Sequence, residues 1–453
     1  MKAKLIPLCV LILTATLAGS ITAQPVITPP NFSVSQLAGG IGINHLLNAM
    51  DVDIFGNVYI MDEPAGPMGI GPRVHRIRPN GIVDLDHAVF FGDTGQMAYH
   101  PLDGRVFIVE NTPVLPVINS VVWRIDTTGG ATQVMNVPVV ATGFTIDNDG
   151  NMYFGGMGIQ GPGLYRKPAN GNNLQFMGAG FGNNEILQSL VSGDVLIASG
   201  NEVRRWTTMT ISPVPYYIGP PIFPNTLGGV NSMARTWFNQ IGQGAIIGTN
   251  IFGTFCFCGD GKAVTLDLLG NNQANFADEP YPQFAGGMKQ IASGIRQDLY
   301  WATLVVAPGG GFLADIYKVT QIPAAGSHGS LSMDVQNGVL TMDLYGDPVG
   351  GDPFLVGIHP APVVTPFGGL LIPPYGLLHV NPLSLNYFPF LDGIGVFLPP
   401  HPFAVIPSGG HFTLTMNVPP TGLTFLAEGV ILDPQHAVNG LFTITNPDPF
   451  MLQ

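Results

Sequence analysis

A short hairpin pattern that returns along the first two thirds of the chain restricts the folds open to this sequence. In its clearest copy, residues 50–62, two apolar runs flank the dipeptide Gly56-Asn57. Such a tip is a strong signal for a β-hairpin, because the tight turn needs positive φ angles that Gly and Asn tolerate. Each copy therefore predicts one pair of antiparallel strands.

Six copies of this hairpin can be aligned before residue 322. The first four tips are Gly56, Gly104, Gly150 and Gly193, which are separated by 48, 46 and 43 residues. That period is about the length of one four-stranded propeller blade. A helical solenoid would need a 3.6-residue periodicity, which is absent. We therefore expect an all-β chain with a six-bladed β-propeller over residues 25–322.

A propeller ring also has to be closed, since an open ring leaves two exposed strand edges. Residues 32–37 alternate apolar and polar side chains in the manner of a strand. This segment is the candidate for a closing strand beside the last blade. The alternative is that it only packs beneath the ring.

The start of the chain predicts export. Residues 1–24 combine Lys2 and Lys4 with an apolar stretch and small residues, the pattern of a signal peptide. No later stretch offers about twenty unbroken apolar residues, so we expect no membrane span after signal removal. The 60 glycines and 41 prolines fit many tight turns. The expected location is secreted, either extracellular or periplasmic.

The charge of the chain excludes one class of partner. The formal net charge of −13 becomes −15 once Lys2 and Lys4 are removed, and no basic stripe offsets it. Such a protein repels a phosphate backbone, so we expect no nucleic-acid binding. Of the cysteines, Cys256 and Cys258 lie beyond the signal, and their redox state stays open.

The residue pattern of the sequence changes after a small-residue linker at residues 323–329. Residues 330–453 contain short alternating strands without Gly-Asn tips. Alternation with one apolar face predicts two sheets packed face to face. We expect a β-sandwich domain over this region.

The hairpin motif of the first three copies reads aspartate, variable residues, Gly-Asn, an apolar residue, Tyr, an apolar residue and later Asp. The second copy matches this motif only in part. It resembles the NHL-repeat and SMP-30/streptogramin-lyase-like six-bladed propellers, over about residues 30–322. The resemblance implies a fold, since such propellers host binding proteins and several enzymes. The segment Leu432-Asp433-Pro434, followed by Asn439-Gly440 and a last strand, is similar to the C-terminal β-sandwich module of many secreted bacterial proteins.

In the first three copies a polar residue lies eight positions before the hairpin glycine, and a looser alignment gives one polar residue in each of the other copies. Inner strands begin at these positions, where propeller ligands usually bind. A ring of amides and one hydroxyl could hydrogen-bond a sugar or a peptide loop. Alternatively, these side chains satisfy backbone groups or hold channel water. The predicted ligand-binding residues are Asn48, Gln96, Thr142, Gln188, Asn231 and Gln290.

A second candidate set lies where the second strands end: Asp62, Glu63, Glu110 and Asn111. With Asn48, these residues could bind Ca²⁺ or another divalent ion through oxygen atoms. The resemblance to SMP-30-like lactonases then implies a metal-dependent hydrolase. Those enzymes take a glutamate from the opening strand, where residues 36–40 have none. A solvated acidic rim without an ion is the alternative.

Motifs for other chemistries are absent. The sequence contains no Gly-x-Ser-x-Gly and no His-Glu-x-x-His. We expect no catalytic residue and no cofactor, and a secreted binding or scaffold protein that recognises a protein or carbohydrate at the cell surface or outside the cell. A structural envelope protein is a further alternative. Next to the glycine tips, turn-forming aspartates explain the pattern without calcium: Asp53, Asp103, Asp147 and Asp149.

Overall fold

The computed structural model describes most of the chain after residue 24, so residues 1–24, most of residues 323–329, and Cys256 and Cys258 lie outside the described residues. Within the described part, every assigned element is a strand, and no helix of the length and apolarity needed to cross a membrane is found. The described ranges are 25–29, 32–43, 46–63, 71–111, 119–171, 173–179, 186–190, 193–207, 213–218, 227–236, 244–252, 259–279, 288–293, 299–306, 311–321, 329–347, 349–360, 370–372, 376–378, 380, 387–433, 442–445 and 448–452.

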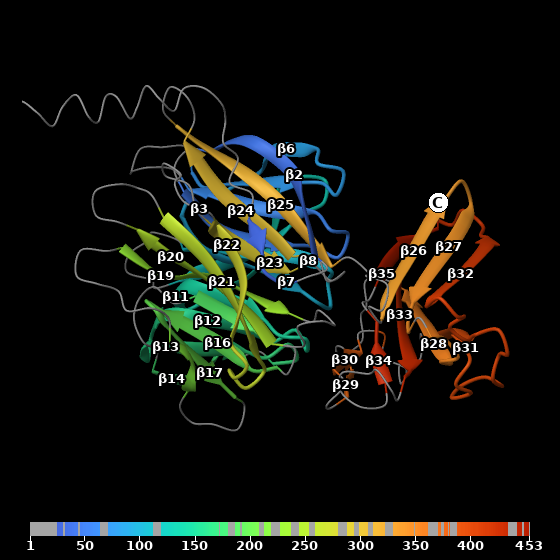
Figure 1. The fold of residues 1–453 in the computed structure, drawn as a ribbon. Helices are drawn as coiled ribbons and strands as arrows, with labels where there is room; N and C mark the ends of the chain where they lie inside the picture. The colour runs from blue at the N-terminus through green and yellow to red at the C-terminus, as the bar shows by residue number, and fades with distance from the viewer. Residues whose placement is uncertain are drawn as a thin grey trace, which may run out of the picture.

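Six antiparallel sheets form the propeller on one side of the molecule (Figure 1). In the first three blades, four strands follow one another from the inside of the ring outward. Their bounds are β3 (Leu46–Val52), β4 (Val58–Glu63), β5 (Arg73–Ile77) and β6 (Val83–Val89); β7 (Asp93–His100), β8 (Arg105–Asn111), β9 (Ser120–Ile125) and β10 (Ala131–Val137); and β11 (Val139–Ile146), β12 (Met152–Gly158), β13 (Gly161–Lys167) and β14 (Gln175–Ala179).

The last three blades repeat this order, with additions from the N-terminus. Blade five gains β1 (Val26–Ile27) at its outer edge, and blade six gains β2 (Phe32–Ile43). The other strands are β15 (Ile186–Ser189), β16 (Val195–Ser199), β17 (Glu202–Trp206) and β18 (Val214–Ile218); β19 (Leu227–Thr236), β20 (Gly244–Phe252), β21 (Gly259–Asp267) and β22 (Ala274–Glu279); and β23 (Met288–Ser293), β24 (Leu299–Val306) and β25 (Phe312–Gln321).

The N-terminal strand closes the ring, as the sequence predicts. β2 pairs antiparallel with β25, in a register that places Val34 opposite Val319. The inner strands contact each other in the order β3, β7, β11, β15, β19 and β23, and β23 contacts β3 again. This arrangement confirms the six-bladed propeller. The short pairing of β1 with β22 was not predicted.

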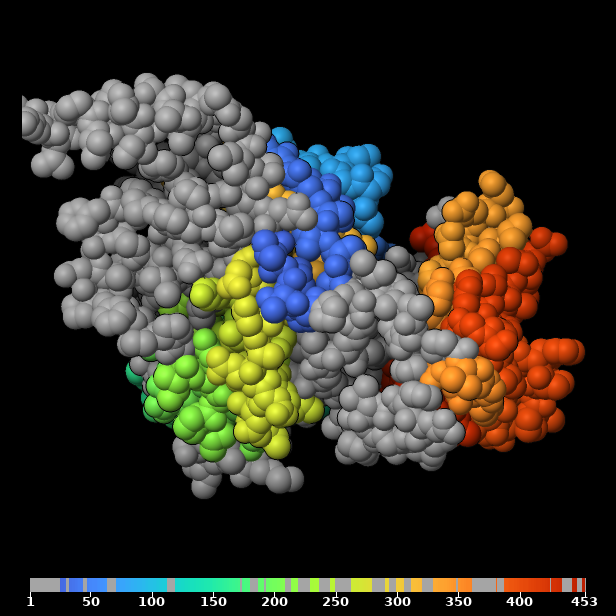
Figure 2. All heavy atoms as spheres, viewed as in Figure 1, coloured from blue at the N-terminus to red at the C-terminus, as the bar shows by residue number. Residues whose placement is uncertain are grey.

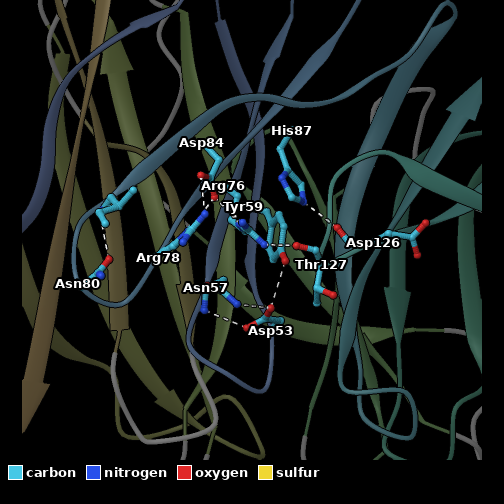
Figure 3. Close-up of polar contacts among 11 residues, drawn as sticks. Asp53, Asn57, Tyr59, Arg76, Arg78, Asn80, Asp84, His87, Asp126 and Thr127 are labelled. Atoms are coloured by element: carbon cyan, nitrogen blue, oxygen red, sulfur yellow. Dashed lines mark hydrogen bonds and ion pairs between the residues drawn. The ribbon is translucent and has the colours of Figure 1, made fainter.

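The hairpin tips explain why the repeated motif folds in this way. The first four tip glycines have φ angles of 78°, 75°, 79° and 85°, in the region that glycine tolerates best. At the first tip, Asp53 Oδ1 accepts the N–H of Phe55 at 2.9 Å. It also accepts the N–H of Asn57 at 2.8 Å, and Oδ2 accepts Asn57 Nδ2 and the Tyr59 hydroxyl at 2.7 and 3.1 Å (Figure 3). One carboxylate thus holds the whole turn.

The third hairpin repeats this turn. Asp147 accepts the N–H groups of Asp149 and Asn151 at 3.0 and 2.9 Å, and the side chains of Asn151 and Tyr153 at 2.8 and 3.0 Å. The turn-forming interpretation is therefore confirmed for Asp53 and Asp147. Asp103 differs, because it lies 3.7 Å from the guanidinium nitrogens of two arginines instead.

Apolar side chains of neighbouring blades share cores. Ile60 of blade one and Ile316 of blade six belong to one buried cluster, and Phe107 of blade two and Phe144 of blade three to another. Burial of this apolar area from water is the main force that holds adjacent sheets face to face. Blade-to-blade packing leaves the inner strands to line the axis.

The C-terminal region lies beside the propeller (Figure 1) and contains two further sheets and a hairpin. Leu331 and Met342 of one sheet and Val356 and Ile431 of the other belong to a single buried cluster. The first sheet consists of β26 (Ser330–Gln336), β27 (Val339–Tyr345) and β32 (His411–Asn417); the second of β31 (Phe388–Asp392), β28 (Phe354–Pro360), β33 (Thr424–Leu432), β34 (Phe442–Ile444) and β35 (Asp448–Met451); and the hairpin of β29 (Leu370–Ile372) and β30 (Gly376–Leu378).

Among the described residues, the two parts meet at an apolar junction. Ile54, at the first hairpin tip, is buried in one cluster with Val380 and Leu426 of the C-terminal region, and Tyr99 and Tyr387 pack against it. Ile54 and Tyr99 both lie where inner strands end. The C-terminal region therefore contacts the hairpin-tip side of the propeller.

Candidate functional site

The inner strands surround a small polar cavity on the propeller axis. Its volume is about 30 Å³, and its polar lining includes Asp51, Gln96, Thr145, Gln188, Arg235 and Gln290. Small-molecule sites usually measure about 300 to 1,000 Å³. A cavity of this size has room for ordered water rather than for a sugar ring.

Four of the predicted ring residues lie at strand irregularities. The pairing registers of β3, β7, β11 and β19 skip Asn48, Gln96, Thr142 and Asn231. A bulge inserts one extra residue and can re-aim a side chain. Of these four, Gln96 lines the cavity, whereas Asn48, Thr142 and Asn231 are not among the residues that line it.

Gln96 lines the cavity and connects three blades. Its Oε1 accepts the N–H of Phe144 in blade three at 3.0 Å and that of Leu187 in blade four at 2.7 Å. The carbonyl of this amide therefore satisfies two backbone donors. This hydrogen bonding agrees with the alternative in which the amide side chains satisfy backbone groups instead of binding a ligand.

Gln290 and Gln188 also bond to the backbone. Gln290 Nε2 donates to the carbonyl of Asn48 at 3.2 Å, across the closure between blades six and one, and its Oε1 accepts the Ser232 hydroxyl at 3.1 Å. Gln188 Nε2 donates to the Ser189 carbonyl at 3.1 Å. Polar side chains of the inner strands thus link one blade to the next.

At the hairpin-tip end of the axis lies a charged group that sequence reasoning missed. Arg235 Nη1 donates to Asn148 Oδ1 at 3.1 Å, and its guanidinium carbon lies 5.8 Å from the centre of the Tyr99 ring. Asp51 accepts the N–H groups of Val52 and Tyr99 at 2.8 and 2.7 Å. The sequence contained part of the signal for this group, because Asp51 and Tyr99 each lie five residues before the glycine of a hairpin tip.

Burial changes the acid–base behaviour of this group. It raises the pKa of Asp51 to about 6, partly offset by the two backbone N–H donors and the charge of Arg235. It also lowers the pKa of Arg235, against the attraction of Asp51. The pKa of Tyr99 is raised by burial as well. Desolvation of charged forms explains all three directions.

The residues of the alternative metal set have protein partners instead. Asp62 Oδ2 forms an ion pair with Arg73 Nη2 at 2.9 Å. Asn111 donates to the Ala141 carbonyl at 3.0 Å and accepts the Ser120 hydroxyl at 2.6 Å. The side chain of Glu63 lies outside the described residues.

Both carboxylate oxygens of Glu110 accept hydrogen bonds from protein donors. Its Oε1 accepts the N–H groups of Phe91 and Gly92 at 2.8 and 2.7 Å, and its Oε2 accepts Trp123 Nε1 at 2.8 Å. Metal ligands need free lone pairs that converge on one point. Among the described residues, no three His, Cys, Asp or Glu side chains form a group suited to a metal ion. The described donor set therefore does not fit a divalent cation.

Glu110 instead fixes a loop that presents an aromatic side chain. Phe90 is buried, and its ring centre lies 6.2 Å from that of Trp123 in an edge-on contact. The next residue, Phe91, is 94% exposed. This loop precedes β7, so it lies at the rim where inner strands begin. Sequence reasoning identified Glu110 at this rim but not the residue that it positions.

Comparisons with known proteins concern the fold alone. No protein-family model and no curated protein matches the sequence. Similar solved structures include an auxiliary nutrient binding protein from Bacteroides thetaiotaomicron, at 11% identity and a TM-score of 0.41, covering 66% of this chain and 75% of that one. A second is the PQQ-bound aldose sugar dehydrogenase of Streptomyces coelicolor, at 14% identity and a TM-score of 0.39, covering 65% of this chain and 100% of that one. A third is TolB of Acinetobacter baumannii, at 13% identity and a TM-score of 0.39, covering 58% of this chain and 64% of that one.

Proposed function

We propose that this chain is an exported binding protein whose propeller recognises a protein or a glycan with the rim around Phe91. In this proposal, residues 1–24 are a signal peptide, residues 25–322 are an NHL/SMP-30-like propeller, and residues 330–453 form a β-sandwich module behind a short linker. The mature protein acts outside the cell or in the periplasm.

One observation carries the proposal: Phe91 is almost completely exposed, yet its backbone is immobilised. A buried glutamate accepts its N–H, and the preceding phenylalanine is anchored in the core. An aromatic side chain has only two side-chain torsions and therefore loses little entropy on binding, and aromatic residues dominate contact energies at interfaces. Aromatic rings also offer an apolar face to a sugar ring.

The cavity and the carboxylates support binding rather than catalysis. The axial cavity is about a tenth of the smallest usual ligand site. At the rim, Asp62 and Glu110 are bonded to protein donors. A ligand would therefore contact the surface of the propeller and leave its channel empty of anything but water.

The first experiment tests recognition directly. The full chain lacking residues 1–24 is applied to a glycan array beside Phe91→Ala and the matched control Leu269→Ala, which alters an exposed side chain in the β21–β22 turn of blade five, at the hairpin-tip end of the propeller. We expect every glycan signal to fall at least about tenfold in Phe91→Ala and to stay unchanged in the control, because burial of one aromatic side chain contributes about 1.5–3 kcal/mol.

A protein ligand is tested by placing a photo-crosslinking phenylalanine analogue at position 91 or, as the control, at position 269. A specific adduct at position 91 alone supports the proposal. Glycan signals equally strong in Phe91→Ala, or adducts of the same protein at both positions, would contradict it. Concentration-dependent self-association without any ligand would favour the structural envelope alternative, and lactone hydrolysis that EDTA abolishes would favour the lactonase alternative.

A further inference from the structure

The last strand of the first C-terminal sheet, β32, has an open edge. Among the described strands it pairs with β27 alone, over seven residues without a register shift. It lies at the edge of the C-terminal region away from the propeller (Figure 1), on a side that is open in Figure 2. His411, Thr413, Thr415 and Asn417 are exposed. One flank of this strand therefore faces solvent.

The hydrogen-bond pattern shows which backbone groups point to that edge. Gly346 N–H donates to the carbonyl of Gly410 at 2.8 Å, and Val418 N–H donates to that of Gly338 at 2.9 Å. Hydrogen-bonded and non-hydrogen-bonded residue pairs alternate along an antiparallel ladder. The even-numbered residues of β32 therefore bond to β27, and the N–H and C=O groups of its odd-numbered residues point outward. Within the described part of the chain, no backbone hydrogen bond joins these outward groups to another segment.

Most other strand edges of the molecule carry features that hinder pairing with a second chain. Charged residues, prolines, bulges and very short strands all have this effect. Register shifts occur in the outer strands β6, β10, β14, β18 and β2 of the propeller, and blade five ends in the two-residue β1. β26, at the opposite edge of the sheet that contains β32, carries Asp334 and contacts β35.

The second C-terminal sheet has the same kind of protection. β31 contains Pro389 and a register shift, and β35 contains Pro449. At the end of β31, Asp392 accepts the N–H groups of four residues in the segment 394–398 and holds the following loop in place. By contrast, β32 contains no proline, no Asp, Glu, Lys or Arg and no bulge. Its edge is therefore ready to pair with another strand.

Charge also favours contact at this edge. The full chain has 29 acidic and 16 basic residues, so two copies carry the same net charge and repel each other. Residues 393–427, which include β32, contain no Asp, Glu, Lys or Arg. On the neighbouring β27, Asp343 accepts His411 Nε2 at 2.9 Å and the Thr413 hydroxyl at 2.7 Å, so its carboxylate is bonded within its own sheet. The open edge is thus a neutral region on an acidic protein.

The sequence of β32 is complementary to itself. Residues 412–416 read apolar, Thr, apolar, Thr, apolar in both directions. Phe412 and Leu414 pack against the core of the C-terminal region, and Met416 on the same face is 40% exposed.

Antiparallel pairing of two such strands matches their faces. When the pair is centred on Leu414, Thr413 of one copy lies opposite Thr415 of the other, and Phe412 lies opposite Met416. Threonine pairs and pairs of apolar side chains both stabilise neighbouring strands. The outward N–H and C=O groups then face each other, because they belong to the odd-numbered residues in both copies. A peptide of another protein needs this alternation by chance, whereas every copy of this chain carries it.

We propose that two copies of this chain associate through β32, which pairs antiparallel with β32 of the second copy and joins the two three-stranded sheets into one. The pairing occupies the open edge of both copies, so it is closed by a twofold axis and ends at a dimer. A structural envelope would require association that continues beyond two copies. The inference concerns a surface other than the Phe91 rim, so it goes beyond the proposed ligand recognition and can fail separately from it.

Sedimentation velocity of the full chain lacking residues 1–24, over a wide range of concentrations and without ligand, tests the proposal. We expect a monomer–dimer equilibrium for the wild type. Thr415→Pro removes an outward N–H that the single molecule does not use, so each copy loses a hydrogen bond and dimerisation should weaken at least about tenfold. The matched control Thr415→Ala keeps this N–H and should dimerise as the wild type does.

A second measurement does not depend on the folding of the proline variant. A spin-labelled amino acid at position 417 lies opposite position 411 of the second copy, six residues along the strand from the label of that copy. Electron–electron double resonance should therefore give about 20 Å between the backbones of the two labelled residues.

Four results would each overturn the proposal. They are a dimer that Thr415→Pro does not weaken, an equal loss in Thr415→Pro and Thr415→Ala, assembly beyond two copies, and a clearly different label distance. A wild type that stays monomeric at every concentration would also overturn it, and would leave the edge of β32 to an extended peptide of another protein.

Discussion

At the scale of residues, buried carboxylates serve as hydrogen-bond hubs in this protein. Asp53, Asp147, Glu110 and Asp392 each accept three or four hydrogen bonds from nearby donors. Hydrogen bonds to a charged group are stronger than neutral ones, so a single side chain can hold a complete turn. These acidic residues contribute to local order rather than to a metal site.

The hub at the third hairpin leads to a stability prediction. Asp147→Ala removes four hydrogen bonds and leaves two turn N–H groups unpaired, so we expect a loss of about 2–4 kcal/mol in the free energy of unfolding. Asp149→Ala, at the exposed neighbouring position, should change it by less than about 0.5 kcal/mol. Urea unfolding of both variants provides the measurement. Equal effects would show that the carboxylate does not organise the turn.

Asp51 predicts a specific pH dependence. Its pKa is about 6 in the folded protein and about 3.9 when unfolded, so the folded state binds the proton more tightly. Its contribution to stability is fully present below about pH 4 and is lost as pH rises through about 6. The stability of the wild type relative to Asp51→Asn should thus fall by on the order of 2 kcal/mol between pH 4 and pH 7. Urea unfolding at several pH values measures this difference, and a flat difference would contradict the assignment.

At the scale of elements, the ring depends on a strand from the other end of the propeller sequence. Val34 of β2 lies opposite Val319 and packs against the core that contains Trp301 and Tyr317. Antiparallel pairing across this seam removes the two edges that an open ring would expose. The seam joins residues almost three hundred positions apart, so it is expected to form late in folding.

Substitutions in β2 test the importance of the seam. Val34→Pro adds a residue without an N–H to the paired strand, so the free energy of unfolding should fall by about 3 kcal/mol or more. Ser33→Ala, at the neighbouring exposed position, should have little effect. Thermal unfolding and aggregation measured by light scattering distinguish the two. A stable, monomeric Val34→Pro variant would show that the ring closes without this strand.

At the scale of the whole molecule, the junction and the proposed binding rim lie at opposite ends of the inner strands. Tyr99 near the end of β7 packs against the junction cluster, whereas Phe91 precedes the start of the same strand. The C-terminal region therefore leaves the Phe91 rim open. This placement lets one end of the propeller bind a ligand while the other contacts the C-terminal region.

In the part of the chain that the structure describes, a single apolar cluster forms the junction, so one substitution should release it. Ile54 is 1% exposed in the apolar cluster between the two parts, and its neighbour Phe55 is 39% exposed. Ile54→Ser should increase the radius of gyration in small-angle X-ray scattering and leave the strand content in circular dichroism unchanged, because it removes the central apolar contact. Phe55→Ser should change neither. An unchanged radius in Ile54→Ser would show that other contacts hold the two parts together.

The local sequence determined the hairpins, their number and the closing strand. Gly56 and Gly150 need positive φ, Asp53 and Asp147 bond to groups within six residues, and alternating side chains specify which face is buried. Such interactions are encoded over a few positions, so a pattern in one sequence is enough to predict them. The fold class followed from their repetition.

Tertiary structure alone decided what the polar residues do. Gln96 finds its partners 48 and 91 residues away, Arg235 meets Asn148 across 87 residues, and Glu110 holds a loop that precedes its own strand pair. Asn48, Thr142 and Asn231 lie at strand irregularities and do not line the axial cavity, whereas Gln96, also at an irregularity, does. A sequence pattern does not contain these choices, because hydrogen-bond partners and desolvation depend on which distant segments the folded ring brings together.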